Sequence, residues 1–333
     1  MRKIYVLSVV VFLTVNLAIS QIPSGKIIVE TLYSELLENP GGENPTRSVT
    51  IYLPPGYEES ETNYPTLYYL PGFTDSDSLY ISSYKMDQLL DKAIALHKIR
   101  PVVVVIPNHN TLYRGSMYTN SPLTGKWEEY TAIDLVNHID NNYRTLRDKD
   151  SRGIVGHSMG GYGAIRIGMH YPEVFSSVYS LSGAFDIVKA MGINGAAYRR
   201  IGEIKTREEL VSGYSEFMPN WLIVLGRAFS PNLNKPPFYA DLPFNYINGN
   251  VDVNDESLEL WNNNMLHNMV DDYYDNLTKL KAIKIDWGRN DDFDFVISGC
   301  RKLSQKLENM GINHFGPVNL HRIEIHIPHH RFP

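Results

Sequence analysis

The fold of this chain is decided by residues 151–164, which read SRGIVGHSMGGYGA. The apolar pair Ile154 and Val155 ends in the pattern G-x-S-x-G, which is centred on Ser158. A stretch rich in small residues then runs from Gly160 to His170 and is typical of a helix that packs closely on its neighbours. The succession predicts a strand, a sharp turn and a helix, with Ser158 at the tip of the turn.

The turn makes Ser158 the candidate nucleophile. Gly156 and Gly160 flank it, and Cβ atoms at those two positions would collide across so tight a turn. The turn holds Ser158 in a strained backbone conformation with its hydroxyl above the sheet. The helix that follows directs free amides and its positive dipole end at the same place. A serine is a poor nucleophile alone, so a base and an orienting carboxylate are expected nearby.

On either side of this stretch, β-branched runs alternate with amphipathic segments, and this alternation is typical of an α/β fold. Strands are predicted at Ile27–Thr31, Ser48–Leu53, Thr66–Leu70, Pro101–Ile106, Ser151–Gly156, Ser176–Leu181, Ala282–Trp287 and Arg322–Ile327. Helices are predicted at Tyr84–His97, Thr131–Tyr143, Gly160–His170 and Phe295–Met310. Because Val102–Ile106 is apolar without alternation, its strand is expected to be buried on both faces. We therefore predict a mostly parallel central sheet with helices on both faces.

The segment from Ala184 to about Tyr274 breaks this rhythm, because it contains clusters of Asn, Pro and aromatic residues. We interpret it as a lid-like insertion over the strand ends and not as an independent domain. Insertions on that rim often contribute to substrate binding. Phe238 and Tyr239, in its Pro-rich part, are the candidate substrate-binding residues.

A carboxylate is expected just past a later strand, because in folds with this turn the partners follow in the order serine, acid, histidine. Asp291 lies in the turn directly after the predicted strand Ala282–Trp287 and is the candidate acid. Asp292, Asp294 and Asp186 remain alternatives.

The base is expected in the loop after the last predicted strand, where Pro328-His329-His330 follows. His330 fits that loop position and is the candidate base, with His329 and His326 as alternatives. His157, beside the nucleophile, is interpreted as a packing residue.

Two backbone N–H groups are needed to stabilise an oxyanion. Met159, directly after the nucleophile, supplies one. The loop after the strand Thr66–Leu70 supplies the other, through the amide of Phe73. Pro71 has no N–H, and Gly72 permits a close approach.

Several stretches together resemble the esterase branch of the α/β-hydrolases, which includes feruloyl esterases, S-formylglutathione hydrolase (esterase D) and the mycolyltransferases. The resemblance covers most of the chain and rests on Val49–Tyr57, Tyr64–Phe73, Ser151–Ala164, Tyr171–Phe175 and Gly288–Asp291. Gly288-Arg289-Asn290-Asp291 looks like the family's acid-bearing Gly-x-x-Asp turn. Pro328-His329-His330 stands where the family has Gly-x-His, and Pro71 stands where it usually has a histidine.

The resemblance implies an α/β-hydrolase fold and a secreted serine carboxylesterase with a Ser158–His330–Asp291 triad and an acyl-enzyme intermediate. Its expected substrates are small-molecule or polysaccharide-linked esters, including feruloyl and acetyl esters. An acyltransferase or a peptidase with the same triad remains open. So does a non-catalytic secreted binding protein on a hydrolase scaffold.

Composition and motif content limit the partners and cofactors that are expected. The chain has 333 residues and a net charge of −6, without a long basic run, so nucleic acid is not an expected partner. One cysteine, Cys300, excludes a disulfide framework and a Cys-based zinc site. Because phosphate-binding Gly loops and His/Glu zinc motifs are absent from the sequence, no cofactor or metal is predicted.

The two ends of the chain lead to two further expectations. Residues 1–20 combine the basic pair Arg2 and Lys3, an apolar run and the small residues Ala18 and Ser20, as in a signal peptide, which predicts a secreted or periplasmic protein without a stable membrane anchor. The sequence stops at Pro333, so we expect the usual closing helix after His330 to be missing. Composition does not define the oligomeric state.

Overall fold

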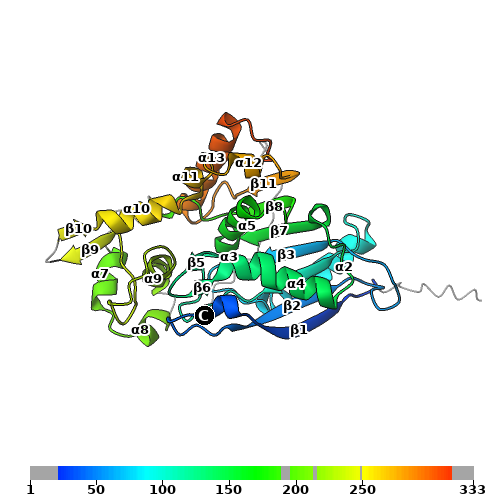
Figure 1. Cartoon of the computed structure of the whole chain (residues 1–333), viewed down its shortest axis with the longest axis horizontal. Helices are drawn as coiled ribbons and strands as arrows, with labels where there is room; N and C mark the ends of the chain where they lie inside the picture. The colour runs from blue at the N-terminus through cyan, green and yellow to red at the C-terminus, as the bar shows by residue number, and fades with distance from the viewer. Residues whose placement is uncertain (1–21, 189–195, 213–215, 248–249, 317–333) are drawn as a thin grey trace, which may run out of the picture.

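The computed structural model describes residues 22–188, 196–212, 216–247 and 250–316. Within these ranges a seven-stranded sheet has the order β1-β2-β4-β3-β7-β8-β11 (Figure 1). Its strands are β1 (Lys26–Tyr33), β2 (Thr46–Leu53), β3 (Thr66–Leu70), β4 (Val103–Pro107), β7 (Arg152–His157), β8 (Ser177–Leu181) and β11 (Ala282–Asp286). The predicted strand Arg322–Ile327 lies outside the described residues, as do the predicted signal peptide and the chain end after His330.

The sheet begins antiparallel and continues parallel. β1 pairs with β2 and β2 with β4 in antiparallel register, whereas β4, β3, β7, β8 and β11 run parallel. All five residues of β4 are buried, as its continuous apolar run predicts. The predicted mostly parallel α/β sheet is therefore confirmed.

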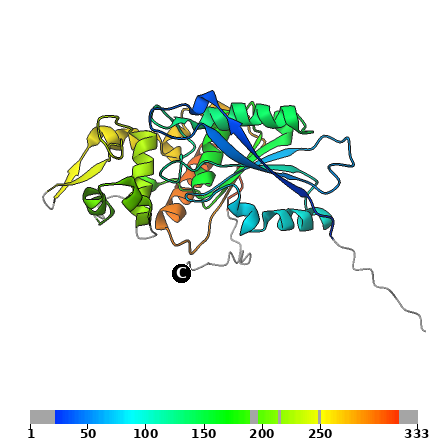
Figure 2. The same cartoon turned by 90° about the horizontal axis from the view of Figure 1, so that it is seen from below.

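Helices cover both faces of the sheet (Figure 2). The helix α2 (Met86–Ala95) packs over a small core around Tyr52, Val104 and Ile106. On the opposite face, α4 (Leu135–Asn142) and α5 (Met159–His170) bury their apolar sides in the main core. These layers are formed because alternate residues of a strand point to opposite faces.

Four further helices belong to the hydrolase body, and of these only α13 was predicted, as Phe295–Met310. They are α1 (Leu79–Ser82), α3 (Trp127–Glu129), α12 (Tyr274–Leu277) and α13 (Asp294–Asn309). Between α3 and α4 lies a π-helical segment, Tyr130–Asp134, so this helical stretch begins before the predicted Thr131. The short strands β5 (Asn120–Ser121) and β6 (Gly125–Lys126) form a hairpin that sequence patterning did not indicate.

The insertion between Ala184 and Tyr274 extends beyond one end of the sheet (Figure 1). Its described elements are α7 (Ala196–Glu203), α8 (Arg207–Val211), α9 (Phe217–Phe229), β9 (Phe244–Ile247), β10 (Asn250–Val253), α10 (Asp255–Asn263) and α11 (Leu266–Met269). Its buried residues belong to the same apolar cluster as the strands of the sheet. None of the helices in the described ranges has the length and apolar character that a membrane crossing requires.

A buried ion pair attaches the insertion to the N-terminal part of the chain. Arg227 of α9 lies 3.0 Å from Glu43, and their side chains are 3% and 1% exposed. Arg227 also donates to the Phe238 carbonyl at 3.0 Å and lies over the Tyr113 ring. Glu43 in turn accepts the Leu112 N–H at 2.7 Å. This cluster fixes α9 against two loops of the hydrolase body.

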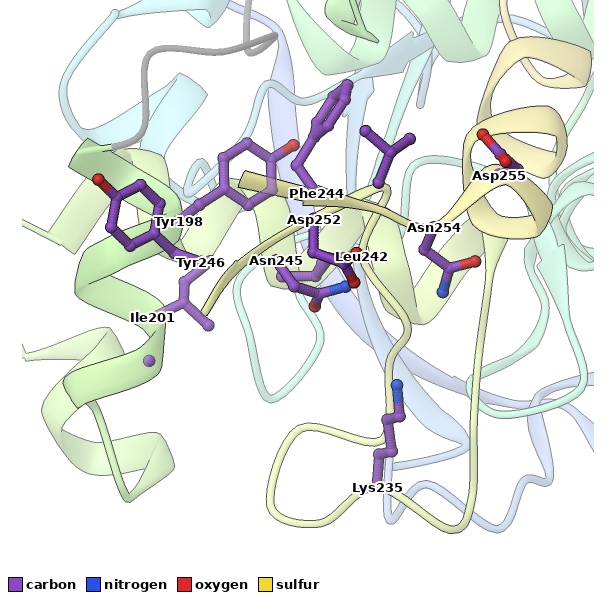
Figure 3. Close-up of a pocket in the computed structure, with 12 residues that line it drawn as sticks. Tyr198, Ile201, Lys235, Leu242, Phe244, Asn245, Tyr246, Asp252, Asn254 and Asp255 are labelled. Atoms are coloured by element: carbon purple, nitrogen blue, oxygen red, sulfur yellow. The ribbon is translucent and has the colours of Figure 1, made fainter. Parts of the chain in front are cut away.

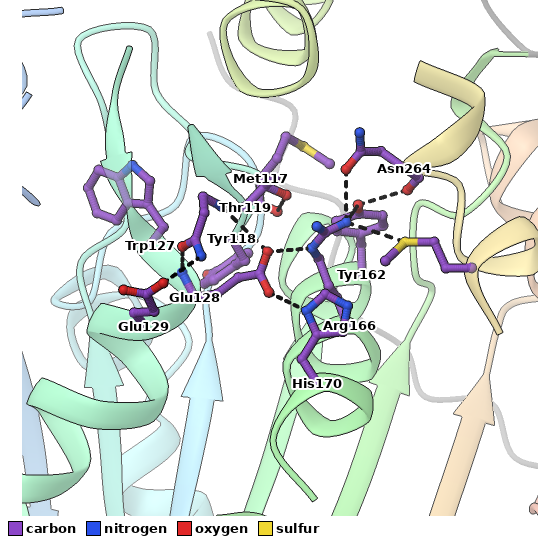
Figure 4. A network of polar contacts seen from close by, with 12 residues as sticks. Met117, Tyr118, Thr119, Trp127, Glu128, Glu129, Tyr162, Arg166, His170 and Asn264 are labelled. Carbon is purple, nitrogen blue, oxygen red and sulfur yellow. Dashed lines mark hydrogen bonds and ion pairs between the residues drawn. The ribbon is translucent and has the colours of Figure 1, made fainter. Parts of the chain in front are cut away.

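A second buried network attaches the other end of the insertion to α5 (Figure 4). Arg166 donates to Glu128 at 2.7 Å, to the Tyr162 hydroxyl at 2.9 Å and to the Asn264 side chain at 3.0 Å. Burial opposes ionisation of Glu128, but the hydrogen bond from His170 and the charge of Arg166 hold its pKa below the ordinary value. Helix α5 and the residue after α10 are therefore held through one guanidinium.

The first prediction concerns the Glu43–Arg227 pair. Glu43→Gln removes the carboxylate and leaves the Arg227 charge buried without its partner, so we expect a loss of about 3–5 kcal/mol in the free energy of unfolding. Urea unfolding followed by tryptophan fluorescence measures it. Glu58→Gln is the matched control, because the Lys26–Glu58 pair at 2.7 Å is exposed. Its unfolding midpoint should not move. Equal midpoints for the two variants would contradict the role given to Glu43.

Candidate active site

Ser158 stands at the tip of the turn between β7 and α5, with φ 55° and ψ −114°. Its N–H donates to the Leu181 carbonyl at 2.9 Å, and its own carbonyl accepts N–H groups from Tyr162 at 3.1 Å and Ala184 at 3.2 Å. The backbone on both sides is thus held by neighbouring segments, which is how a strained conformation persists. The arrangement has the geometry of a nucleophile elbow.

Two glycines make the turn possible. A Cβ on Gly156 would lie 2.2 Å from the Gly160 carbonyl, and a Cβ on Gly160 would lie 1.9 Å from the Leu70 carbonyl oxygen. Both contacts are with backbone atoms, which do not move aside as a flexible side chain would. Helix α5 therefore approaches β3 and β7 more closely than any residue with a side chain would allow.

Further residues with positive φ gather near this end of the sheet. Thr74 has φ 72°, Arg114 φ 74° and Ser182 φ 47°. The Thr74 N–H donates to the Arg114 carbonyl at 3.1 Å, which links the loop after β3 to the loop after β4. Strained residues of this kind concentrate at functional sites, where neighbouring structure holds them.

The side chains of Phe73 and Met159, whose amides are the predicted oxyanion donors, lie on either side of Gly115. A Cβ on Gly115 would lie 2.9 Å from the Met159 sulfur and 2.9 Å from the Phe73 ring. Within the described part of the chain, neither the Phe73 nor the Met159 amide has a hydrogen-bond acceptor. Free N–H groups are what the stabilisation of a tetrahedral oxyanion requires, so both amides stay available for the predicted role.

A group of hydrogen bonds among Gly72, Asp75 and Tyr80, called the brace below, holds the Phe73 loop. The Tyr80 hydroxyl donates to the Asp75 carboxylate at 2.9 Å and accepts the Gly72 N–H at 3.4 Å. The Asp75 N–H donates to the Gly72 carbonyl at 3.2 Å. Burial raises the pKa of Asp75, while the Tyr80 hydrogen bond and the nearby His157 oppose that shift. The brace fixes the turn in which Phe73 presents its amide.

His157 lies beside this brace, because a Cβ on Gly72 would sit 3.1 Å from the Asp75 carboxylate and 3.4 Å from the His157 Nδ1 atom. Burial lowers the pKa of His157, and the charges of Asp75 and Asp291 act in the opposite direction. Asp291 is therefore within electrostatic reach of the residue next to Ser158. The acid loop and the elbow share one rim of the sheet, as the sequence predicts for strand ends.

The alternatives to Asp291 have different surroundings. Asp291 is half-buried and accepts the Phe293 N–H at 3.1 Å, whereas Asp292 and Asp294 are exposed. Asp186 is buried, and its carboxylate lies 3.9 Å from Lys302 of α13. Among the four carboxylates, Asp291 is partly shielded and has no ion-pair partner within the described residues, and its role as the acid stays a prediction.

The candidate bases His330, His329 and His326 lie outside the described residues. Among residues 22–188, 196–212, 216–247 and 250–316, the structure pairs no histidine with the Ser158 hydroxyl. The base therefore stays a sequence-based prediction.

Aromatic rings connect the loops that surround Ser158. The Phe73 ring lies 4.6 Å from Trp221 and 5.2 Å from Phe217, both of α9. Phe217 stacks on Phe293, two residues after Asp291, at 5.9 Å and 17°. The row formed by Phe73, Phe217 and Phe293 thus runs from the oxyanion loop to the acid loop. Sequence reasoning missed Phe217 and Trp221, although the apolar run Phe217–Phe229 was a visible signal.

The predicted substrate-binding residues lie deeper in the insertion. Phe238 is 9% exposed, with its ring 6.3 Å from Tyr113, and Tyr239 is half-buried with φ 56°. Their role in substrate binding stays a prediction. No group of three or more potential metal ligands occurs in the described ranges.

The family model described as "Putative esterase" matches residues 43–292, which include Phe73, Ser158 and Asp291. The chain belongs to this esterase family. An esterase of Mycobacterium tuberculosis (strain H37Rv) is 31% identical over 98 residues, which are 28% of this chain and 21% of that protein. S-formylglutathione hydrolase of Paracoccus denitrificans is 43% identical over 49 residues, 15% of this chain and 17% of the enzyme. The chain thus spans about a fifth of these curated relatives.

Solved structures confirm the predicted α/β-hydrolase fold. A ferulic acid esterase superimposes with a TM-score of 0.59 at 20% identity, over 88% of this chain and 89% of that one. An S-formylglutathione hydrolase from Agrobacterium tumefaciens does so with a TM-score of 0.56 at 15% identity, over 89% and 88%. At these identities the similarity establishes the fold.

The second prediction concerns the brace. Tyr80→Phe keeps the ring, which lies 4.7 Å from Tyr69, but removes the hydroxyl that joins Gly72 to Asp75. We expect kcat for an ester to fall about tenfold with KM almost unchanged, because a loosened donor loop affects chiefly the transition state.

Tyr84→Phe is the control for Tyr80→Phe, since Tyr84 is 44% exposed and its ring lies 5.1 Å from Tyr80. That variant should keep the wild-type kcat. A Tyr80→Phe enzyme with raised KM and unchanged kcat would show that the brace serves substrate binding and not the position of the oxyanion donor.

Proposed function

We propose that this protein is a secreted serine carboxylesterase that hydrolyses acyl esters through Ser158, Asp291 and His330. The observation that supports it most is the strained Ser158 backbone at φ 55°, together with the unbonded amides of Phe73 and Met159 within the described residues. A nucleophile and oxyanion donors are two of the parts that acyl transfer needs, and a base with its orienting carboxylate completes them.

In the proposed reaction, the Ser158 Oγ attacks the ester carbonyl while His330 accepts its proton. The amides of Phe73 and Met159 stabilise the tetrahedral oxyanion. His330 then returns the proton to the leaving alcohol, which departs and leaves an acyl group on Ser158. Water activated by His330 attacks this acyl-enzyme and releases the acid. Asp291 holds the imidazole in the required tautomer throughout.

Aromatic acyl groups are the proposed preference. The rings of Phe73, Phe217 and Phe293 contact one another in a row between the oxyanion loop and the acid loop. Phe217 and Phe293 are half-buried. Half-buried rings offer stacking area at little entropic cost. Feruloyl esters of polysaccharides fit this chemistry, with acetyl esters as the smaller alternative. A signal peptide at residues 1–20 would place the enzyme where such polymers occur.

The third prediction tests the nucleophile. Ser158→Ala should lower turnover of methyl ferulate and phenyl acetate by several orders of magnitude with unchanged folding. A fluorophosphonate probe should label the wild-type protein at Ser158 and leave the variant unlabelled, as mass spectrometry of the peptides would show. Labelling of the variant at the same rate, or retention of more than a few per cent of activity, would exclude Ser158.

The fourth prediction concerns the acid. Asp291→Asn should reduce kcat by at least about a hundredfold, because the imidazole then loses its orienting carboxylate. Asp292→Asn and Asp294→Asn are matched controls on the same loop. Their kcat should stay near the wild-type value, since both side chains are exposed. Wild-type activity should fall as the pH drops through the ordinary pKa of a histidine side chain, about 6.5. Equal losses in all three variants would mean that another carboxylate orients the base.

A further inference from the structure

A second hollow lies inside the insertion, between the hairpin β9–β10, helix α7 and the loop around Lys235 (Figure 3). Its volume is about 700 Å³, and a neighbouring hollow of about 410 Å³ shares Ile201, Lys235, Leu242 and Asn245 with it. Volumes of this size are in the range of ligand pockets, roughly 300–1,000 Å³.

This hollow is separate from the Ser158 site. None of its lining residues comes from the elbow, the Phe73 loop or the Asp291 loop. The two places are connected through α9, because Ile223 lines the neighbouring hollow and Phe217 and Trp221 of the same helix contact Phe73. Helix α9 thus contributes residues both to the neighbouring hollow and to the surroundings of Phe73.

The floor of the hollow is apolar and aromatic. Ile201 and Leu242 form part of it, and the Tyr198 ring packs edge-on against Phe244 at 5.6 Å. Tyr246 beside them is half-buried and accepts a hydrogen bond from Arg199 at 3.1 Å. Such surfaces pack against the C–H face of a ligand ring and still leave hydroxyl groups for hydrogen bonding.

The wall of the hollow offers paired polar groups. Asn245 and Asp252 stand opposite each other in the register of the β9–β10 hairpin, so their side chains lie on the same face. Asp252 and Asp255 are exposed, and the structure assigns neither side chain a partner within the described ranges. An amide beside a carboxylate donates and accepts at neighbouring positions, which matches the hydroxyl pattern of a sugar ring.

The charges of the lining residues disfavour an anionic ligand. Lys235 is the one cation among the described residues that line it, and Asp241 already pairs with it. The carboxylates of Asp252 and Asp255 leave the surface acidic. Phosphates and uronates would be repelled, whereas an uncharged polyhydroxyl ligand would not.

We propose that this hollow binds an uncharged oligosaccharide and holds the carbohydrate part of the substrate. The inference rests on the proposed function for its use in catalysis. Hydrogen bonds to Asn245 and Asp252 and contact with the aromatic floor supply the recognition. A polymer-linked ester is then held at two places, at Ser158 and in the insertion, whereas a small ester is held only at Ser158.

The test uses full-length Ser158→Ala protein, which binds without turnover, and isothermal titration with xylotetraose, cellotetraose, tetragalacturonate and spermidine. We expect one or both neutral tetrasaccharides to bind, and tetragalacturonate and spermidine not to bind. Adding Asn245→Ala and Asp252→Ala should weaken the neutral binding about tenfold or more, because hydrogen bonds to a charged group are lost. Asp272→Asn, an exposed aspartate between α11 and α12, is the control and should bind as before.

Asp252→Asn separates the two chemistries that an acidic hollow admits. It keeps a hydrogen-bonding side chain, so a neutral sugar should still bind within about threefold, whereas a cation should lose its attraction. Binding of spermidine and not of the tetrasaccharides would overturn the proposal, as would neutral binding that survives the double substitution.

Hydrolysis distinguishes failure of this site from failure of the proposed function. In the Ser158 background, Asn245→Ala with Asp252→Ala should raise KM for a feruloylated oligosaccharide about fivefold and leave methyl ferulate turnover unchanged. If fluorophosphonate labels Ser158 and methyl ferulate is cleaved but no tetrasaccharide binds, the carbohydrate site is wrong and the esterase stands. If the tetrasaccharides bind but neither methyl ferulate nor phenyl acetate is cleaved, the proposed function is wrong.

Discussion

The close approach of α5 to the sheet is the constraint on which the rest of the structure depends. At Gly156 and Gly160 the helix and the strands touch backbone to backbone, at distances where a Cβ would sit 2.2 Å or less from carbonyl atoms. Farther along, a Cβ on Gly168 would lie 2.1 Å from the Val178 side chain. This contact fixes the angle at which the chain leaves β7, so it determines where Ser158 points and where the Met159 amide lies. Nearby loops are then arranged around these two groups.

Three segments far apart in the sequence meet at this rim, and each is held by its own polar contacts. The Phe73 loop depends on Tyr80 and Asp75, and Asp291 is fixed by the Phe293 N–H. The insertion contributes α9, whose Phe217 and Trp221 pack on Phe73, while Arg227 anchors the other end of the helix to Glu43. The loops around Ser158 are therefore held by hydrogen bonds and one buried ion pair as well as by the sheet.

The parts that could be predicted from sequence are those governed by local geometry. The strand Thr66–Leu70 was predicted with the observed bounds, and the elbow follows from where glycine alone fits. The parts that could not be predicted depend on distant partners. Arg227 and Glu43 form an ion pair although they are 184 residues apart in the sequence, and no local sequence pattern predicts such a pair. Helix α9 is buried from Pro219 to Phe229, and which loops it packs against depends on contacts with segments far away in the sequence. Likewise, composition singled out Phe238 as a candidate substrate-binding residue, but it could not indicate that the Phe238 ring lies next to Tyr113.

The guanidinium of Arg166 has a consequence for how this protein could change over time. It is bonded on one side by Glu128 of the hydrolase body and on the other by Asn264, just after α10 of the insertion. Replacing the whole insertion would remove Asn264 and leave an N–H of the buried guanidinium without its acceptor, which costs about 1–3 kcal/mol. Wholesale exchange of the segment is thus a poor route to a new specificity. Substitutions on the exposed hairpin β9–β10, whose strand β10 is solvent-exposed along its whole length, touch none of these bonds. Point substitutions on this hairpin are therefore compatible with the buried contacts that hold the insertion on the hydrolase body.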